Sequence, residues 1–457
     1  MNCLNINNGL KVGIITVAHL REPSEAARKI IEDCNKAVKD YGCDVIYNNK
    51  ILTSNTEVRE SLIELKVSNV DAIIAIVTNW VEPPTLVQPL SEIGNIPLIL
   101  WGFPETDYYL DQGIFFGSSS AAAVIKSAFE QMNYKFQYIM GMPEEPASRK
   151  RLETALDNIR VTSRLKRSKI GLIGYNSMGI YTATFDQLGL KKHFGIEIDN
   201  RADSYIVVKM MEEIKEDEIE EVRKRFDKGY VFAEDTKQSL ELSLKMYLAL
   251  KKLVKEGEWD ALSVKCQHEF TSYLRCAACL PLSMLTDEGV MCSDEGDIHA
   301  AVTMLIMRNI SDAVLFFGDI YPYNHRSLLM SHCGLVPHSC HDNSCDIVLN
   351  PMSPRISKDG INTGGIVSTL RYKSGKVTLA RLEGRGAGSY AMHILEGTAY
   401  PVKSIGSNYS TVEIRLDSQM DYDSFVRNQI SNHYIMIYDE IEDKLRKYCR
   451  YNRIMVL

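Results

Sequence analysis

Carboxylates stand at both ends of the stretch from Cys292 to Asp319, where their spacing could support chemistry. Glu295 and Asp297 precede an apolar run with helical spacing, and Asp319 ends the short apolar run "AVLFFGD". The 24 positions from Glu295 to Asp319 (319 − 295 = 24) suffice for one helix and one strand that runs back. Ligands of α/β proteins gather beyond the carboxyl ends of the strands. We therefore expect the two carboxylates to meet at one site.

Such a pair of carboxylates would suit a divalent cation. Two ionised carboxylates repel each other, and a cation relieves that repulsion. Carboxylate oxygens suit Mg²⁺ or Mn²⁺, and an added imidazole shifts the preference toward Mn²⁺. The alternative interpretation is structural: Glu295 would cap a helix and Asp319 would begin a turn. Spacing alone leaves both interpretations open.

The elements that would position these residues alternate between strand and helix. Lys11–Val17 is a predicted strand, and Ser168–Asn176 restarts the same pattern after a charged helix that ends near residue 165. This alternation is typical of parallel sheets with helices on both faces. We expect an α/β fold with two doubly wound, Rossmann-like domains at residues 1–165 and 166–320. The run "AVLFFGD" is expected to be the last strand of the second domain.

The pattern becomes rich in predicted strands after about residue 320. The run "GGIVSTLRYKSGKVTLARLEG" contains two strand-like halves that meet at Ser374-Gly375, which is a hairpin signal. The run "TVEIRL" adds another strand, and the chain ends with an apolar run, an amphipathic helix and a final strand. We expect a mostly antiparallel β domain at residues 321–457.

Composition narrows the class of protein. The chain has 457 residues and a formal net charge of -7, which argues against a general nucleic-acid binder. We see no signal-peptide pattern and no apolar stretch of about 18 residues, so we expect a cytoplasmic protein without a membrane span. The 11 cysteines are an odd number in a large chain, and reduced thiols are the simpler expectation.

Three segments in order resemble a known family. They are "DEGDIHAAVTMLIM…AVLFFGD", "SHCG" and the C-terminal "NHYIMIYDEIEDKLRKYCRYNRIMV". Together they resemble the L-fucose isomerase family, which is grouped with L-arabinose isomerase among metal-dependent aldose–ketose isomerases. The resemblance covers most of the chain, from the first strand through "LILWGF" to the last strand. No single motif is highly specific, but their order and spacing together are fairly specific.

The resemblance implies a metal site made by Glu295, Asp319 and His433, holding Mn²⁺ or Mg²⁺. Fucose isomerase-like members commonly read Cys-Glu-Gly-Asp at the first site, whereas this chain reads Cys-Ser-Asp-Glu-Gly-Asp. The two extra residues leave Asp294 and Asp297 as alternative ligands. His332 in "SHCG" resembles an additional histidine of the arabinose isomerases, and could bind either the metal or the substrate.

The resemblance also implies a reaction. An aldose and its 2-ketose differ by a proton moved between C2 and C1, and the reaction passes through an enediolate. A divalent metal polarises the carbonyl, and the carboxylates of Glu295 and Asp319 would move the proton. Fucose, arabinose, other deoxy or pentose sugars and a sulfonated sugar such as sulfoquinovose all remain open as substrates. Because the first domain of a neighbouring subunit covers the sugar in this family, we expect a hexamer, or at least a trimer.

Five further residues are candidates for contact with the sugar. Trp80 would stack on it, or else pack in the core. An anionic substrate would give roles to Arg21 and Arg385, although Arg21 also suits a salt bridge to Glu22 or Glu25. Lys265 and Gln267 follow a predicted strand and would hydrogen-bond sugar hydroxyls, or else lie at the edge of the core.

Other interpretations remain open. The His/Cys-rich run from His332 to Cys345 and the pair Cys276 and Cys279 could hold zinc, but their spacings match no standard zinc motif. A second function from a different class is a sugar-binding or sensor protein without catalysis, because two Rossmann-like lobes also occur there. The absence of a helix-turn-helix pattern and the acidic charge argue against a repressor. The late His433 and a β-rich third domain are not needed by a sensor.

Overall fold

The computed structural model describes residues 9–19, 25–105, 117–234, 236–274, 276–352, 364–403 and 409–457. These residues form two compact units, one that ends at Ser163 and one that runs from Arg164 to Leu457. The three domain ranges expected from the sequence stay predictions.

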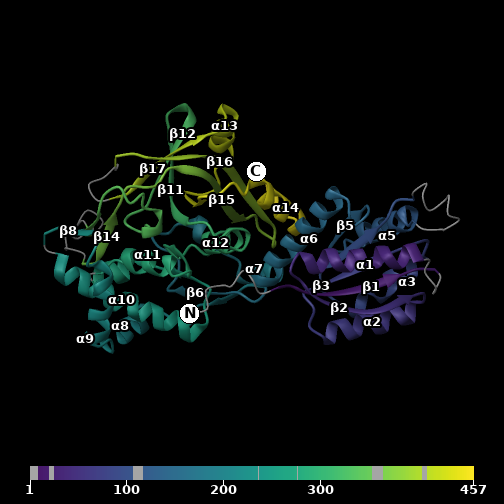
Figure 1. Ribbon diagram of the computed structural model, residues 1–457. Coiled ribbons are helices and arrows are strands. Elements are labelled where there is room, and N and C mark those ends of the chain that lie inside the picture. Colours follow the sequence, from purple (N-terminus) through teal and green to yellow (C-terminus); the bar gives the residue numbers. More distant parts are fainter. Residues whose placement is uncertain are drawn as a thin grey trace. The chain divides into compact units, whose positions relative to one another are not determined.

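A parallel sheet forms the centre of the first unit, with strand order β2-β1-β3-β4-β5 among its described residues. β3 reads AIIAIV and is buried along its whole length, as expected for a parallel strand covered by helices on both faces (Figure 1). A capping box between Ser54 and Glu57 begins helix α2. The elements are β1 (Lys11–Val17), α1 (Glu25–Asp40), β2 (Asp44–Leu52), α2 (Asn55–Val67), β3 (Ala72–Val77), α3 (Pro83–Val87), β4 (Leu98–Gly102), α5 (Ser119–Gln131), β5 (Phe136–Met140) and α6 (Pro146–Leu165), whose last residues enter the second unit.

The second unit begins with another parallel sheet, in the order β10-β9-β6-β7 among the residues described there. The two parallel sheets confirm the predicted α/β class. The elements of this part are β6 (Lys169–Ile173), α7 (Gln187–Phe194), β7 (Glu197–Asp199), α8 (Ser204–Glu212), α9 (Glu216–Arg223), β8 (Tyr230–Phe232), α10 (Thr236–Gly257), β9 (Ala261–Val264), the π-helix η4 (Cys266–Tyr273), α11 (Cys279–Asp287), β10 (Met291–Asp294) and α12 (Ile298–Ile310).

An antiparallel barrel completes the second unit. Its strands follow the order β15-β18-β11-β12-β17-β16, and β16 pairs again with β15, so six strands close a ring within the described part of the chain. β19 joins β16 as a parallel neighbour. The predicted antiparallel C-terminal region is confirmed. Its elements are β11 (Leu315–Tyr323), β12 (Ser327–Ser331), β13 (Ile347–Pro351), β14 (Ile366–Thr369), β15 (Gly375–Gly384), β16 (Tyr390–Pro401), β17 (Thr411–Leu416), α13 (Gln419–Asn428), β18 (His433–Ile437), α14 (Glu442–Asn452) and β19 (Met455–Val456).

Two expectations about individual strands were wrong. β11, which contains "LFFGD", is not the last strand of the parallel sheet, because it pairs antiparallel with β12 and β18 in the barrel. The expected hairpin at Ser374-Gly375 does not form, because β14 pairs with β13 while β15 pairs with β16. In both cases a short apolar run indicated a strand correctly but carried no information about its partner.

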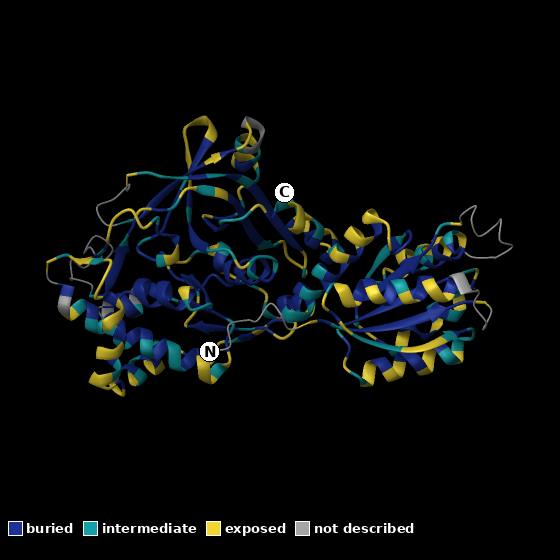
Figure 2. Cartoon of the chain, in the orientation of Figure 1, coloured by how far each residue is buried: buried dark blue, intermediate teal, exposed yellow. Residues whose placement is uncertain are grey.

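Helix α12 lies between the second parallel sheet and the barrel. It packs against β9, β10 and β6 on one side and against β15, β18 and β11 on the other (Figure 1). All of its residues except Arg308 and Ile310 are buried. Figure 2 shows the burial of each residue: most strand residues are buried, and many exposed residues lie on the outer helices. In the described ranges, no helix combines the length and apolarity needed to cross a bilayer.

Candidate functional site

A left-handed turn at the end of β10 presents the first carboxylate. Glu295 and Gly296 follow β10 with positive φ angles of 61° and 73°. A Cβ atom on Gly296 would lie 2.1 Å from the carbonyl oxygen of Tyr175, so only glycine fits there. A positive φ is uncommon for glutamate, and such outliers cluster at functional sites. The turn places the Glu295 side chain, which is 6% exposed, just before α12.

His433 is the first residue of β18 and lies next to three carboxylates. Its Nε2 lies 3.1 Å from Glu295 Oε2 and 3.6 Å from Asp319 Oδ1. Its Nδ1 lies 2.8 Å from Asp297 Oδ2. The strand register places Asp319 directly opposite His433, so the barrel sets this pair while the turn after β10 adds Glu295. The expected meeting of Glu295, Asp319 and His433 is therefore seen in the structure.

His332 completes a candidate ion site with Glu295 and His433. One ligand atom from each of the three residues lies within 4.8 Å of the others, and all three residues are buried. The Nε2 atoms of His332 and His433 are buried and make no hydrogen bond among the described residues. His433 Nε2 faces Glu295 as an ion-pair partner, so the Nε2 of His332 is the buried nitrogen that lacks a partner, and an ion is one explanation for it. One carboxylate and two imidazoles, with Asp319 beside them, fit Mn²⁺ better than Mg²⁺.

Asp297 contacts the His433 ring nitrogen that does not face Glu295, and it also caps α12. Its Oδ1 accepts a hydrogen bond from the Ala300 N–H at 2.9 Å, which begins the helix. Its Oδ2 lies 2.6 Å from Arg381 Nη1 and also faces His433. Arg381 and Asp297 are both 0% exposed, and Arg381 further donates to Glu383 and to the Thr182 carbonyl. A carboxylate on Nδ1 leaves Nε2 of His433 free to face an ion, as is usual for histidine ligands.

The burial and charges of this cluster shift its ionisation. Burial opposes ionisation of Glu295, but the adjacent His433 outweighs it and lowers the pKa of Glu295. Burial likewise opposes ionisation of Asp297, but Arg381 and His433 hold the pKa of Asp297 well below its usual range. Burial disfavours protonated His433, yet Asp297 and Glu295 raise its pKa to about 9. Burial raises the pKa of Asp294 to about 7. Without an ion the cluster therefore keeps a proton on His433, which a divalent cation would displace.

Arg381 is a site residue that the sequence analysis missed. It lies in β15, where Val377 to Leu382 are all buried. An arginine inside the largely apolar run VTLARL was the available signal, because a buried charge needs a partner. The sequence could not identify that partner, since Asp297 lies 84 residues earlier in the chain.

The predicted sugar-contact residues lie in different surroundings. Lys265 Nζ pairs with Glu269 at 2.6 Å, and Gln267 is 6% exposed near Ser177. Arg385 is exposed on the turn between β15 and β16. Trp80 belongs to the first unit and is 44% exposed, so it is not core packing. Arg21 lies outside the described residues. A sugar-binding role stays a prediction for each.

The His/Cys-rich run gathers only in part: Cys333 lies beside Cys279, whereas two of its histidines lie elsewhere. His338 lies within hydrogen-bond distance of Tyr230 Oη and of Ser368 Oγ. His341 lies 3.7 Å from the Cys345 sulfur. Neither His338 nor His341 belongs to a described group of three potential ligands, whereas Cys279 and Cys333 do, together with Asp294.

Comparisons with known proteins show which families and enzymes this chain is similar to. The L-arabinose isomerase central domain matches residues 169–313, a range that includes Glu295 and Asp297. A sulfoquinovose isomerase from Priestia aryabhattai is 24% identical over 88% of this chain and 88% of its own length. A sulfoquinovose isomerase from Alkalicoccus urumqiensis is 23% identical over 79% of this chain and 80% of its own length. An L-arabinose isomerase from Bacillus subtilis (strain 168) is 21% identical over 39% of this chain and 36% of its own length.

The comparison with solved structures adds no argument about fold. A periplasmic solute binding protein from Actinobacillus succinogenes 130z with bound D-allose is 11% identical, with a TM-score of 0.19, over 66% of this chain and 91% of that chain. The sequence matches carry the assignment instead: the matched central domain, and the sulfoquinovose isomerases that are similar along most of the chain, show that the protein is an isomerase.

Proposed function

We propose that the protein is a metal-dependent aldose–ketose isomerase. The observation that carries this proposal is the convergence of Glu295, His332 and His433, in which the buried Nε2 of His332 makes no hydrogen bond among the described residues. Glu295, Asp319 and His433 would hold Mn²⁺ or Mg²⁺, and His332 is placed to join them. When bound, the cation would polarise the sugar carbonyl and stabilise the enediolate.

The residues of this chain supply the proton transfer. Glu295 is buried and would take the proton from C2 of the aldose in a site shielded from water. Asp319, whose side chain is 25% exposed, would face the open side of the site and return a proton to C1. Asn432 donates to Asp319 Oδ1 at 2.9 Å and would fix the orientation of that carboxylate. Asp297 and Arg381 would hold His433 in place.

The substrate we propose is a sulfonated aldose of the sulfoquinovose type, with deoxy and pentose aldoses as the other candidates. The sulfoquinovose isomerases are similar to this chain along most of its length, whereas the arabinose isomerase match covers a smaller share. The negatively charged sulfonate of such a sugar would be recognised by Arg385 or Lys265. We place the reaction in the cytoplasm, since the ten described cysteines are free thiols.

A panel of aldoses tests the function directly. The chelated protein would be reloaded with Mn²⁺ and incubated in deuterated water with sulfoquinovose, L-fucose and L-arabinose, and ketose formation followed by NMR. We expect conversion of at least one sugar, with deuterium at the proton-transfer carbon, and loss of both after EDTA treatment. Binding of a sugar without any conversion, in metal-loaded protein, would overturn the isomerase proposal in favour of a sensor.

Metal retention should depend more on His433 than on His332. His433 Nε2 lies close to two carboxylates and its ring is fixed by Asp297, so His433→Ala removes an oriented ligand. We expect at least about a tenfold weaker Mn²⁺ affinity in His433→Ala and a smaller loss in His332→Ala. Metal titration by calorimetry measures both, and His325→Ala removes an exposed histidine as a control. Wild-type affinity in His433→Ala would contradict the assignment.

The enzyme is also proposed to be a homo-oligomer, a hexamer or at least a trimer. In the fucose isomerase-like proteins that the sequence resembles, the first domain covers a neighbouring subunit's sugar site. Light scattering with in-line chromatography measures the mass in solution. A fully active monomer would exclude this arrangement.

A further inference from the structure

Two pairs of neighbouring residues divide their side chains between two clusters. Glu295 and His332 contribute to the cluster around His433, as described above. Their neighbours Asp294 and Cys333 contribute instead to a second cluster, together with Cys279. In each pair the two neighbouring side chains take part in different clusters, so each pair serves both clusters. The second cluster takes no part in the proposed isomerase mechanism.

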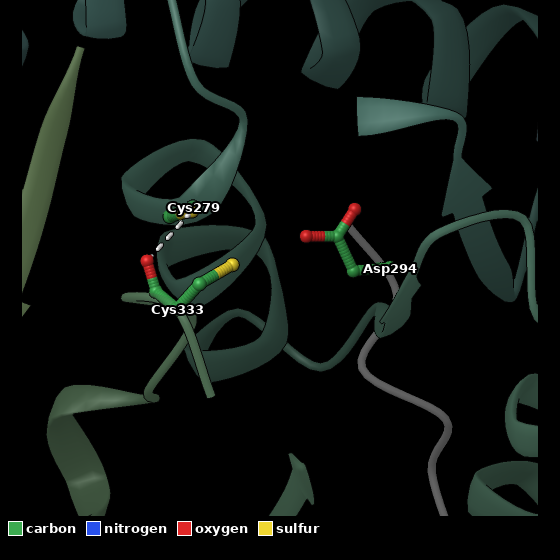
Figure 3. Close-up of side chains that lie close together, drawn as sticks. All are labelled: Cys279, Asp294 and Cys333. Atoms are coloured by element: carbon green, nitrogen blue, oxygen red, sulfur yellow. Dashed lines mark hydrogen bonds between the residues drawn. The ribbon is translucent and has the colours of Figure 1, made fainter. Parts of the chain in front are cut away.

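The second cluster has the geometry of a metal site. One sulfur from Cys279, one from Cys333 and one carboxylate oxygen of Asp294 lie within 4.8 Å of one another. Figure 3 shows the Cys333 sulfur and the Asp294 carboxylate on facing sides of one small space, with Cys279 beside them. Cys279 and Asp294 are buried, and Cys333 is of intermediate exposure.

Asp294 supplies an independent indication of a ligand. Its Oδ1 accepts a hydrogen bond from the Glu295 N–H at 2.9 Å. Its Oδ2 is buried and has no hydrogen-bond partner among the described residues, and the residue is 0% exposed. Burying a carboxylate oxygen without a partner costs free energy unless an ion or hydrogen-bond donor meets it. The nearby thiols of Cys279 and Cys333 are the remaining ligands of such an ion.

We propose that Cys279, Cys333 and Asp294 form a second metal site, specific for a thiophilic divalent cation of the Zn²⁺ class. Two sulfurs select for Zn²⁺ over Mn²⁺ and Mg²⁺, whereas the carboxylate and imidazoles of the first cluster are harder ligands. Each cysteine releases its thiol proton to solvent as its sulfur binds the cation, and no electron is transferred. Three protein ligands leave a fourth tetrahedral position for water.

The two sites would be linked through short stretches of chain. Cys333 Sγ also lies 3.5 Å from His332 Nδ1, and Asp294 precedes Glu295 directly. A cation held by Cys333 and Asp294 would therefore fix the backbone on both sides of the first cluster. The proposal does not depend on the isomerase assignment, because its test measures metal–sulfur bonding.

Cobalt titration tests the second site. Co²⁺ replaces Zn²⁺ and gives a sulfur-to-cobalt charge-transfer band only when thiolates bind it. Reduced, metal-free protein should develop this band until one thiolate-bound cobalt is present per chain, a second cobalt at the first cluster adding nothing to the band, and added Zn²⁺ should remove the band. Cys279→Ser and Cys333→Ser should each lower the band at least twofold and weaken the cobalt affinity at least tenfold. Asp294→Asn should weaken the affinity while keeping the band.

Two controls separate this site from the rest of the protein. Cys276→Ser changes a buried cysteine three residues before Cys279 that lies 4.0 Å from Ser243 Oγ, and it should leave the band intact. His433→Ala should also keep the band, although it removes a ligand of the first cluster. If Cys279→Ser fails to fold, the partly exposed Cys333→Ser carries the same test. A wild-type protein without the band, or an equal loss in Cys276→Ser, would overturn the proposal.

Discussion

Glu295→Gln should lower turnover by at least about 10²-fold, the lower end of general acid–base contributions. Glutamine keeps the volume of Glu295 and one coordinating oxygen but does not accept the proton. The fold should survive, because the residue lies in a turn between β10 and α12 rather than inside an element. Steady-state kinetics by NMR, with the rate of deuterium exchange at C2 of the sugar, measures the effect. Asp319→Asn should show a loss of similar size.

A matched control exists for the backbone of Glu295. Glu258 also has a positive φ, of 54°, but its side chain is 79% exposed and pairs with Lys169. Glu258→Gln should leave turnover unchanged. A loss of turnover seen in Glu295→Gln but not in Glu258→Gln is then not a general effect of replacing a glutamate that has a positive φ. If both site variants fold, bind Mn²⁺ and exchange the C2 proton at the wild-type rate, these carboxylates are not the acid–base pair. Asp294, Asp297 and Lys265 would then be the residues to examine.

Arg381→Met should cost about 3–5 kcal/mol in the free energy of unfolding, the usual loss when one partner of a buried ion pair is removed. The substitution leaves Asp297 ionised and buried without its main counter-charge. Urea unfolding, followed by circular dichroism, gives the change in midpoint. Arg385→Met, four residues later on an exposed turn, should change the stability by less than about 0.5 kcal/mol.

A double variant separates the ion pair from simple packing. Arg381→Met combined with Asp297→Asn removes both charges, so it should be more stable than Arg381→Met alone. Arg381→Lys should fall between Met and the wild type, because one ammonium group does not reach Asp297, Glu383 and the Thr182 carbonyl together. Equal midpoints for Arg381→Met and Arg385→Met would show that the pair adds nothing to stability.

Local patterns in the sequence located most elements, because short apolar runs and helical spacing are local properties. The predicted strand Lys11–Val17 agrees with β1, and the predicted final strand and helix agree with β19 and α14. The pairing between strands could not be predicted from these local patterns. Asp319 was expected beside Glu295 through a parallel sheet, but it reaches the site from the antiparallel barrel. Its position was right and the argument for it was wrong.

The site residues show the same difference: local motifs identified some of them, but not the contacts between residues that are distant in the sequence. Glu295 and His433 could be named from their motifs, whereas the partner of His433 could not. Asp297 was expected as an alternative metal ligand, yet it caps α12 and contacts both His433 and Arg381. Such a contact depends on the packing of α12 between two layers, which no short pattern in the sequence reports.

The distances along the chain between these contacts bear on how the protein folds. His433 and Asp297 are separated by 136 residues, and Arg381 and Asp297 by 84. Contacts between residues so far apart close large loops, and their loop-closure entropy opposes folding until the contacts form. During synthesis Asp297 leaves the ribosome 136 residues before His433, so the contact between them has to wait for strand β18. The ion site can therefore form only after both the second parallel sheet and most of the barrel have been made.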